Sequence, residues 1–350
     1  MKKYLHIIVI NLLLLGVLFC IVELLLLAVV KSMLLIYVPR AARISFYNES
    51  RNIIQFLPEC AEYDPELTYV LKKSSEFYFW NLEFRTHYRT NSLGLRDEEK
   101  SLKKPKIVIL GDSLAMGWGV EQEETYAKIL ESKSGLPTLN AGVSSYGTFR
   151  EMKMLDRIDT SDIEYIIVQY NENDLEENYR YCYLHDKPMT QESYRKYQNE
   201  AGYAFGKYTL VLARFLKKNI FSVAKKYYGK KDTEVDYLRR TGLSDAKDRE
   251  VDLFLHYLLH KEKLDYRKTK IIVFELSDPS RYKEDFIKSL KERVASRQSN
   301  EYRNIRILDM MSKLDHTDYF QIDDHMNKSG HIKVSNELLK EITAVRLRTE

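Results

Sequence analysis

The chain has 350 residues, of which 44% are hydrophobic and 30% charged, a balance that excludes an intrinsically disordered protein and allows one large or two small globular domains. The net charge is only +4 and the basic residues are spread along the chain, so the concentrated basic stripe of a nucleic-acid-binding protein is absent. The three cysteines, Cys20, Cys60 and Cys182, form neither a metal-binding nor a C-x-x-C pattern. Cys60 and Cys182 are either free thiols or a disulfide pair in an oxidising compartment.

An apolar segment near the amino terminus, residues 7–30, predicts a membrane anchor. Its 24 residues include Asn11 and Glu23 as the only strongly polar side chains. As a helix rising about 1.5 Å per residue, it exceeds the hydrocarbon core of roughly 30 Å. It is also longer than the apolar region of a cleaved signal peptide, and no small-x-small cleavage site follows. We therefore assign residues 1–38 to a single-pass anchor and its juxtamembrane segment. Basic residues flank both ends, so they do not fix the side of the membrane.

Residues 39–104 are predicted to form a β-rich lead-in. Apolar and polar side chains alternate over 81–85, which predicts a strand, and TNSLGLRD (90–97) predicts a turn around Gly94. The polar, proline-containing segment 101–106 ends the lead-in.

The remaining segment, 105–350, alternates short apolar stretches with helical patterns. The apolar stretches are rich in Ile and Val, as expected of parallel strands covered on both faces, and lie at 106–110, 165–170, 270–276 and 305–309. The helical patterns lie at 251–259, 283–297 and 328–345. This alternation predicts a doubly wound α/β sheet, in which sites lie at the carboxyl ends of the strands.

Residues 178–246 interrupt this alternation and are rich in Tyr and Lys. A helix is predicted at about 207–226, with lysines beside apolar residues. The segment is either a lid or basic surface that touches anionic lipid, or an insertion that packs on the main domain.

A candidate nucleophile, Ser113, follows the first predicted strand in the tripeptide Gly111-Asp112-Ser113. A catalytic serine needs a base, a carboxylate to orient that base, and donors for an oxyanion. The segment DYFQIDDHMNKSG offers His325 as a base, with Asp323 and Asp324 just before it. The alternative is that Asp112 and Ser113 cap a helix and His325 is a solvated loop residue. His331 is expected to be structural.

Candidate oxyanion donors follow two further strand ends. Asn173 comes just after the strand at 165–170, although an asparagine there could simply cap the next helix. The loop 138–148, which contains Gly142 and Ser145, can aim backbone N–H groups at the same point or form an ordinary turn.

Together, the strand-end serine, the glycine-containing loop, the strand-end asparagine and the late Asp-x-His resemble the GDSL/SGNH hydrolase family over residues 106–345. YDPELTY (63–69) and TNSLGLRD look like the lead-in of its membrane-anchored bacterial members. The resemblance implies a three-layer α/β/α domain with a mostly parallel sheet.

By the same resemblance, Ser113 is the nucleophile in the GDSL match at 111–114, His325 the general base and Asp323 its orienting carboxylate. Asn173 is the side-chain oxyanion donor and Ser145 a further catalytic position. The resemblance implies that Asp112 supports the nucleophile turn from behind Ser113, and Asp112 and Gly142 are the predicted substrate-binding residues.

The sequence departs from the family pattern at three places. Ser145 stands where the second conserved block has glycine, and Asn171 stands where the Gly-x-Asn-Asp block has glycine. The Asp-x-x-His spacing is shortened, so either Asp323 or Asp324 could orient His325.

The resemblance implies a membrane-anchored serine esterase or acyltransferase, with acetyl as the expected acyl group. Its substrate would be an acylated glycan or lipid of the cell envelope, its domain would lie outside the cytoplasm, and no metal, organic cofactor or nucleic acid is expected. The alternatives are a catalytically silent envelope module that binds polysaccharide or a partner membrane protein, and a lipase with a basic lid. The sequence does not separate hydrolysis from transfer.

Overall fold

The computed structural model describes residues 2–31, 47, 51–183, 187–203, 244–259, 264–279, 282, 285–297 and 300–347. The chain forms two compact units, one with residues 1–52 and 199–231 and one with residues 53–198 and 232–350. The first contains helix α1 (Lys2–Lys31), in which His6–Leu26 has a mean hydropathy of 2.8 over 21 residues and is long and apolar enough to cross a membrane. The helix predicted at 207–226 lies outside the described residues.

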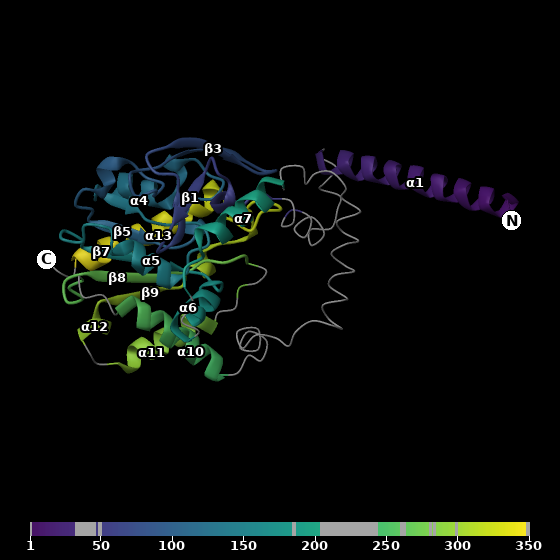
Figure 1. Cartoon of the computed structure of the whole chain (residues 1–350). Helices are drawn as coiled ribbons and strands as arrows, with labels where there is room; N and C mark the ends of the chain where they lie inside the picture. Colours follow the sequence, from purple (N-terminus) through teal and green to yellow (C-terminus); the bar gives the residue numbers. More distant parts are fainter. Residues whose placement is uncertain are drawn as a thin grey trace. The chain divides into compact units, whose positions relative to one another are not determined.

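A five-stranded, fully parallel sheet forms the centre of the second unit (Figure 1). Its strand order is β6-β5-β7-β8-β9, with β5 (Ile107–Leu110), β6 (Thr138–Asn140), β7 (Tyr165–Tyr170), β8 (Lys270–Glu275) and β9 (Ile305–Leu308). The four predicted strands are confirmed as β5, β7, β8 and β9. Every residue of β5 and β7 is buried, as expected of parallel strands covered on both faces. The edge strand β6 has only three residues, which is why the sequence indicates no more than a strand end there.

The strand order creates a switch point between β5 and β7. From β5 the chain crosses to β6 on one side, whereas β7 leads on to β8 and β9 on the other. In open α/β sheets such a point leaves a crevice beyond the carboxyl ends of the two strands, where ligands bind.

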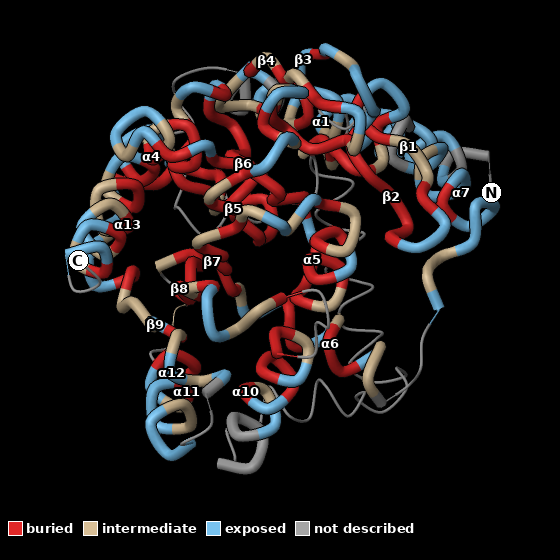
Figure 2. Tube along the Cα trace, turned by 90° about the vertical axis from the view of Figure 1, so that its left-hand side faces the viewer, coloured by how far each residue is buried: buried red, intermediate tan, exposed pale blue. Residues whose placement is uncertain are grey.

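Helices cover both faces of the sheet, which confirms the predicted α/β/α architecture. Alternate strand residues point to opposite faces: Val108 and Ile166 join the cluster under α5, α10 and α11, whereas Ile109 and Ile167 join the cluster under α4 and α13. The helices beyond α1 are α3 (Ser113–Met116), α4 (Tyr126–Ser134), α5 (Thr148–Leu155), α6 (Asp174–Tyr183), α7 (Gln191–Tyr203), α10 (Ser244–Leu259), α11 (Asp285–Ser296), α12 (Asn300–Arg303) and α13 (Lys328–Leu347). Figure 2 shows the strands buried and the flanking helices with one exposed face each.

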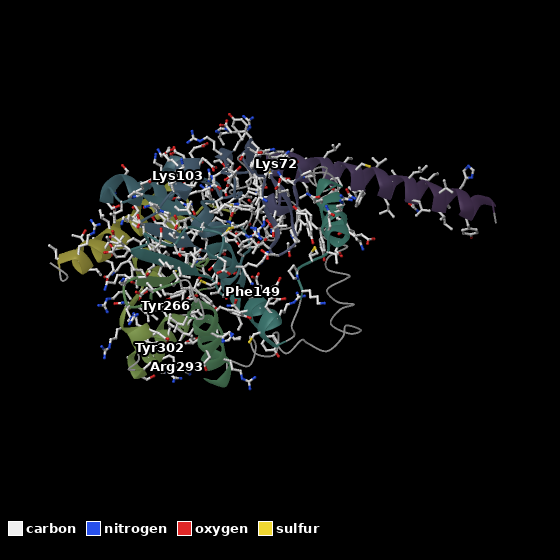
Figure 3. The ribbon with its side chains drawn as sticks, turned by 60° about the vertical axis from the view of Figure 1, so that its left-hand side comes forward. Lys72, Lys103, Phe149, Tyr266, Arg293 and Tyr302 are labelled. Atoms are coloured by element: carbon white, nitrogen blue, oxygen red, sulfur yellow. The ribbon has the colours of Figure 1, made fainter. Side chains whose placement is uncertain are left out.

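Two neighbouring helices on one face of the sheet, α10 and α11, are also linked by an ion pair at the surface. Arg293 on α11 forms an ion pair with Asp252 on α10, and lies with Tyr302 on the same side of the unit in Figure 3, away from Lys72 and Lys103. The helical patterns predicted at 251–259, 283–297 and 328–345 correspond to α10, α11 and α13.

Residues 53–104 of the lead-in belong to the same unit as the sheet and contain two antiparallel hairpins. They are formed by β1 (Ala61–Asp64) with β2 (Thr68–Leu71), and by β3 (Glu76–Trp80) with β4 (Arg85–Arg89). The strand predicted at 81–85 is wrong: Asn81 donates its N–H to the Phe84 carbonyl at 3.0 Å in the turn between β3 and β4. Five alternating residues are too few to distinguish a strand from the loop of a hairpin. The turn predicted around Gly94 is confirmed, with a φ of +74° at that glycine.

The cysteines are free thiols in this structure. Cys60 is buried in the lead-in and Cys182 is half-buried on α6. Burial raises the pKa of Cys60, so its thiol is protonated and packs as a small apolar side chain.

Candidate active site

Ser113 is the first residue of the short helix α3, directly beyond the carboxyl end of β5. The Asp112 carboxylate accepts the Leu114 N–H at 2.8 Å and so caps this helix. Gly111 has a φ of +153°, and a Cβ there would lie 2.6 Å from Oε1 of Gln169, the oxygen that accepts the Asp112 N–H at 3.2 Å. The tight turn therefore both begins a helix and fixes where the serine hydroxyl points.

His325 lies against Ser113 although 212 positions separate the two in the sequence. The His325 Nε2 and Ser113 Oγ atoms are 2.7 Å apart, and both side chains are buried. On the other side of the ring, His325 Nδ1 lies 2.5 Å from Asp323 Oδ1 and 3.2 Å from Asp324 Oδ1. The structure thus brings serine, imidazole and carboxylate into one hydrogen-bonded chain.

The geometry favours Asp323 over Asp324 as the partner of His325. Asp323 is only 1% exposed, is closer to Nδ1, and accepts a hydrogen bond from Trp118 Nε1 at 3.0 Å. It also accepts the His325 backbone N–H at 3.1 Å, which fixes the carboxylate relative to the ring.

The pKa of His325 is raised to about 9. Burial acts to lower it, but the negative charge of Asp323, together with its hydrogen bond and the contact with Asp324, outweighs burial because both favour the imidazolium. Asp323, Asp324 and His325 also offer atoms within 4.8 Å of one another that could hold a metal ion. A metal ion on Nδ1 would displace the Asp323 bond that aligns the ring with Ser113.

Two residues that sequence reasoning missed hold this chain in place. The Trp118 ring stacks on the His325 ring, with centroids 4.7 Å apart and planes 14° apart. The Glu83 carboxylate, at the tip of the β3–β4 hairpin, accepts the backbone N–H groups of three consecutive residues of the histidine loop, namely Gln321, Ile322 and Asp323, at 2.8–2.9 Å. Neither carries a sequence signal, because each acts through a contact with residues more than 200 positions away.

Asn173 lies just before α6 at the carboxyl end of β7, the other strand of the switch point. Burial raises the pKa of Asp112, and a hydrogen bond from the Asn173 side chain opposes this rise only in part. The Asn173 amide is thus next to the nucleophile turn and is exposed to solvent. Asn171, at the family's glycine position, instead donates its Nδ2 to the Leu276 carbonyl at 3.0 Å and ties β7 to the end of β8.

Ser145 has a backbone conformation that glycine adopts far more readily than other residues. Its φ is +59°, in the left-handed region, and its hydroxyl accepts Gln55 Nε2 at 3.1 Å. The Gln55 Oε1 atom also accepts the Ser144 hydroxyl at 3.2 Å, so the lead-in holds this loop from outside. In the described part of the chain, the Ser145 backbone N–H has no hydrogen-bond partner.

Gly142 serves close packing at the nucleophile helix. A Cβ at this position would lie 2.6 Å from the Met116 backbone nitrogen and 2.7 Å from the Ala115 Cβ. The Gly142 N–H donates to Asn140 Oδ1 at 3.1 Å, so it is already bonded within the protein.

His331 is buried and its Nδ1 accepts the Tyr126 N–H at 3.2 Å, which agrees with the structural role predicted for it. Burial lowers the pKa of His331 to about 3, so the ring remains neutral.

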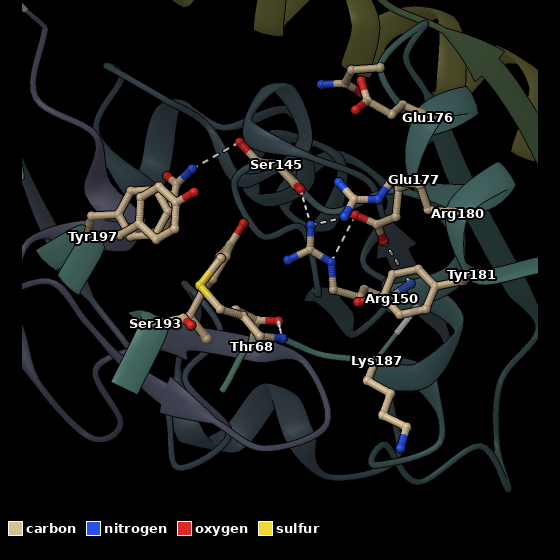
Figure 4. Close-up of a pocket in the computed structure, with 15 residues that line it drawn as sticks. Thr68, Ser145, Arg150, Glu176, Glu177, Arg180, Tyr181, Lys187, Ser193 and Tyr197 are labelled. Carbon is tan, nitrogen blue, oxygen red and sulfur yellow. Dashed lines mark hydrogen bonds and ion pairs between the residues drawn. The ribbon is translucent and has the colours of Figure 1, made fainter. Parts of the chain in front are cut away.

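A cavity of about 550 Å³ is shown in Figure 4; Ser113 and His325 are not among the residues that line it. Ser145 and Asn173 contribute to its lining, and the other walls come from the lead-in, from α5 and α6, and from residues 187–197.

No protein-family profile matches the chain, and none of the curated protein sequences matches it. Solved structures similar to it include a member of the lipolytic protein G-D-S-L family from Veillonella parvula, at 12% identity over 68% of this chain and 97% of that one, with a TM-score of 0.37. A putative GDSL-like lipase from Bacteroides ovatus matches at 14% identity over 69% of this chain and 53% of its own, with a TM-score of 0.38. A two-domain esterase active on acetylated mannans matches at 11% identity over 72% of this chain and 52% of its own, also with a TM-score of 0.38.

These are lipolytic and esterase proteins, and the first two carry the family name that the motif at 111–114 predicts. The chain spans about half the length of the latter two. At these identities and TM-scores the similar structures say nothing about activity, which is therefore argued below from the side chains of the site.

Proposed function

We propose that the protein is a membrane-anchored serine esterase or acyltransferase that acts on an ester-linked acyl group. The observation that carries this proposal is the chain from Ser113 Oγ to His325 Nε2 at 2.7 Å, and from His325 Nδ1 to Asp323 at 2.5 Å. A serine activated by an oriented imidazole is the arrangement that acyl transfer through a covalent intermediate requires.

In the first half-reaction, Ser113 Oγ attacks the ester carbonyl carbon while His325 Nε2 takes the hydroxyl proton. Asp323 accepts the Nδ1–H bond and stabilises the imidazolium that forms. We assign the Ser145 backbone N–H and the Asn173 side-chain amide as the oxyanion donors. The loop that carries Ser145 is joined to the nucleophile turn by the Val143 N–H, which donates to the Gly111 carbonyl at 3.0 Å. The tetrahedral intermediate then collapses: the bond to the alcohol oxygen breaks, His325 gives that oxygen its proton, and Ser113 keeps the acyl group.

In the second half-reaction, water or another hydroxyl attacks the acyl-serine. His325 removes the proton of the attacking oxygen and returns it to Ser113 Oγ as the acyl group leaves. Water gives hydrolysis and a sugar hydroxyl gives acyl transfer, so the acceptor that the site admits decides between the two.

The apolar helix α1 supports the proposal that the protein is a single-pass membrane protein. We place its catalytic unit outside the cytoplasm, with an acylated glycan or lipid of the cell envelope as substrate. A reporter fused after Glu350 that is active only outside the cytoplasm tests this orientation.

The activity is tested with the full chain in detergent micelles, by hydrolysis of p-nitrophenyl acetate with and without an added sugar acceptor. Ser113→Ala and His325→Ala should each lose turnover. Ser161→Ala is the matched control, because this exposed serine precedes β7 and so lies at the amino ends of the strands, away from Ser113. Turnover in Ser113→Ala equal to that of the unaltered protein would contradict the proposal. So would the absence of both hydrolysis and transfer in the folded, unaltered protein.

A further inference from the structure

We infer that the cavity of about 550 Å³ beside Ser145 and Asn173 is a binding site for an uncharged sugar of the substrate. This inference rests on the proposed function, because the cavity meets the site at the two proposed oxyanion donors. The cavity is within the range of about 300–1,000 Å³ typical of small-molecule sites and is far larger than an acetyl group requires. It therefore takes the part of the substrate beyond the ester.

The charged groups at the centre of this cavity neutralise one another. Arg150 Nε lies 2.9 Å from Glu177 Oε2, and the Arg150 guanidinium also donates to the Ser145 carbonyl oxygen. The same guanidinium lies over the rings of Tyr69 and Tyr146, at 5.1 and 4.4 Å from their centroids. Because its charge is already compensated, Arg150 offers no strong site for an anion, and the cavity favours a neutral polar ligand.

Aromatic rings flank this neutral centre on two sides. Tyr197 on α7 stacks on Phe56 of the lead-in, with centroids 5.4 Å apart and an angle of 22°, and is 47% exposed. Tyr181 on α6 stacks on Phe149 at 4.0 Å. Figure 4 shows Tyr197 and Tyr181 on opposite sides of Ser145 and Arg150. Sugars have C–H faces that pack on such rings and hydroxyl groups that need hydrogen-bond partners, which this lining provides.

A fatty acyl chain does not suit the same walls. Thr68, Ser193 and the Arg150–Glu177 ion pair line the cavity, and an alkyl chain would remove their water without offering hydrogen bonds in return. The exposed charges Glu176, Arg180 and Lys187 lie among the lining residues, where solvent screens them.

The test is binding of the full-length Ser113→Ala protein, in detergent micelles, to an array of oligosaccharides built from neutral, amino and uronic-acid sugars. Because this variant cannot form an acyl-enzyme, binding is scored separately from activity. Tyr197→Ala, added to Ser113→Ala, should weaken binding of the best neutral oligosaccharide about tenfold, and Tyr197→Phe should retain it within about twofold. Tyr78→Ala is the matched control, because Tyr78 is 53% exposed but lies on β3 outside the cavity.

Selective loss in Tyr197→Ala, with binding retained in Tyr197→Phe and Tyr78→Ala, supports the inference. It is overturned if no neutral oligosaccharide binds, if only uronic-acid sugars bind, or if Tyr197→Ala binds as well as its parent. Glycan binding by a protein that neither hydrolyses an ester nor transfers its acyl group would leave this inference standing and remove the proposed activity instead.

Discussion

The indole Nε1–H of Trp118 donates to Asp323 Oδ2 at 3.0 Å while the same indole ring stacks on the imidazole of His325. One side chain therefore contacts both the base and the carboxylate that orients it. Asp323 is buried, so the hydrogen bond satisfies an oxygen that water does not reach.

Replacement of Trp118 by Phe keeps an aromatic ring over His325 but removes the donor to Asp323. A hydrogen bond to a charged group contributes about 1.5–3 kcal/mol, so kcat for p-nitrophenyl acetate should fall by roughly 10- to 100-fold. KM should change little, because the indole does not contact the proposed substrate cavity. Steady-state kinetics on the folded variant measure both constants. An unchanged kcat would show that the Trp118 bond is not needed to position Asp323.

Asparagine substitutions at Asp323 and Asp324 separate the two carboxylates beside His325. Asp323→Asn should lower kcat by about 10³- to 10⁴-fold, because the wrong imidazole tautomer would then face Ser113. Asp324→Asn should lower kcat less than about tenfold, because Asp323 still holds the ring. The two variants serve as controls for each other, and a larger loss in Asp324→Asn would reverse the assignment.

The rate should rise with pH up to an unusually alkaline value. His325 must be neutral to take the Ser113 proton, and its pKa is about 9 in the folded protein. Below that pH the imidazolium predominates, so kcat/KM should increase about tenfold per pH unit between pH 6 and 8. Rates are measured after subtraction of the Ser113→Ala background at each pH. A plateau that begins near pH 7 would mean that the Asp323 charge does not raise the histidine pKa in this way.

In Asp324→Asn the same profile should move to lower pH. Asp324 contributes a charge and a hydrogen bond that raise the His325 pKa, and the amide removes the charge.

Glu83→Gln tests the contact between the β3–β4 hairpin and the histidine loop. The amide keeps one acceptor oxygen, but its NH₂ group would face a backbone N–H that the Glu83 carboxylate now accepts. We expect about a tenfold loss of kcat, because small displacements of a catalytic group cost rate steeply.

The control for Glu83→Gln is Glu123→Gln. Glu123 is exposed and pairs with Arg89, so its replacement should change neither kcat nor the melting temperature measurably. If both variants behave alike, the Glu83 contact does not position the loop.

The sheet and its helices follow from local sequence patterns. Buried parallel strands such as β5 and β7 are continuous apolar runs and could be predicted within a residue or two. The apolar side chains of α10 recur at helical spacing only from Val251 onward, so its start at Ser244 was missed. Ser113 and Asn173 could be proposed because each follows a predicted strand, and His325 because Asp323 lies two residues before it. Their roles as nucleophile, oxyanion donor and base came from the resemblance to the GDSL/SGNH family.

The residues that hold the catalytic groups in position could not be predicted from local sequence patterns. Gln55, Glu83 and Trp118 act through contacts with residues about 90 to 240 positions away, and no local period encodes such pairs. Ser145 is a different case. Its departure from the family's glycine is visible in the sequence, but only the structure shows that Ser145 has a left-handed backbone and that Gln55 donates to its hydroxyl.

The central claim is that Ser113 is a nucleophile activated by His325. A fluorophosphonate reacts covalently with such serines, so we would treat the full-length protein in micelles and locate the adduct by peptide mass spectrometry. The account predicts a single adduct on Ser113, its absence in Ser113→Ala, and much slower labelling in His325→Ala. An unlabelled Ser113 in the folded protein, or labelling that is equally fast in His325→Ala, would contradict it.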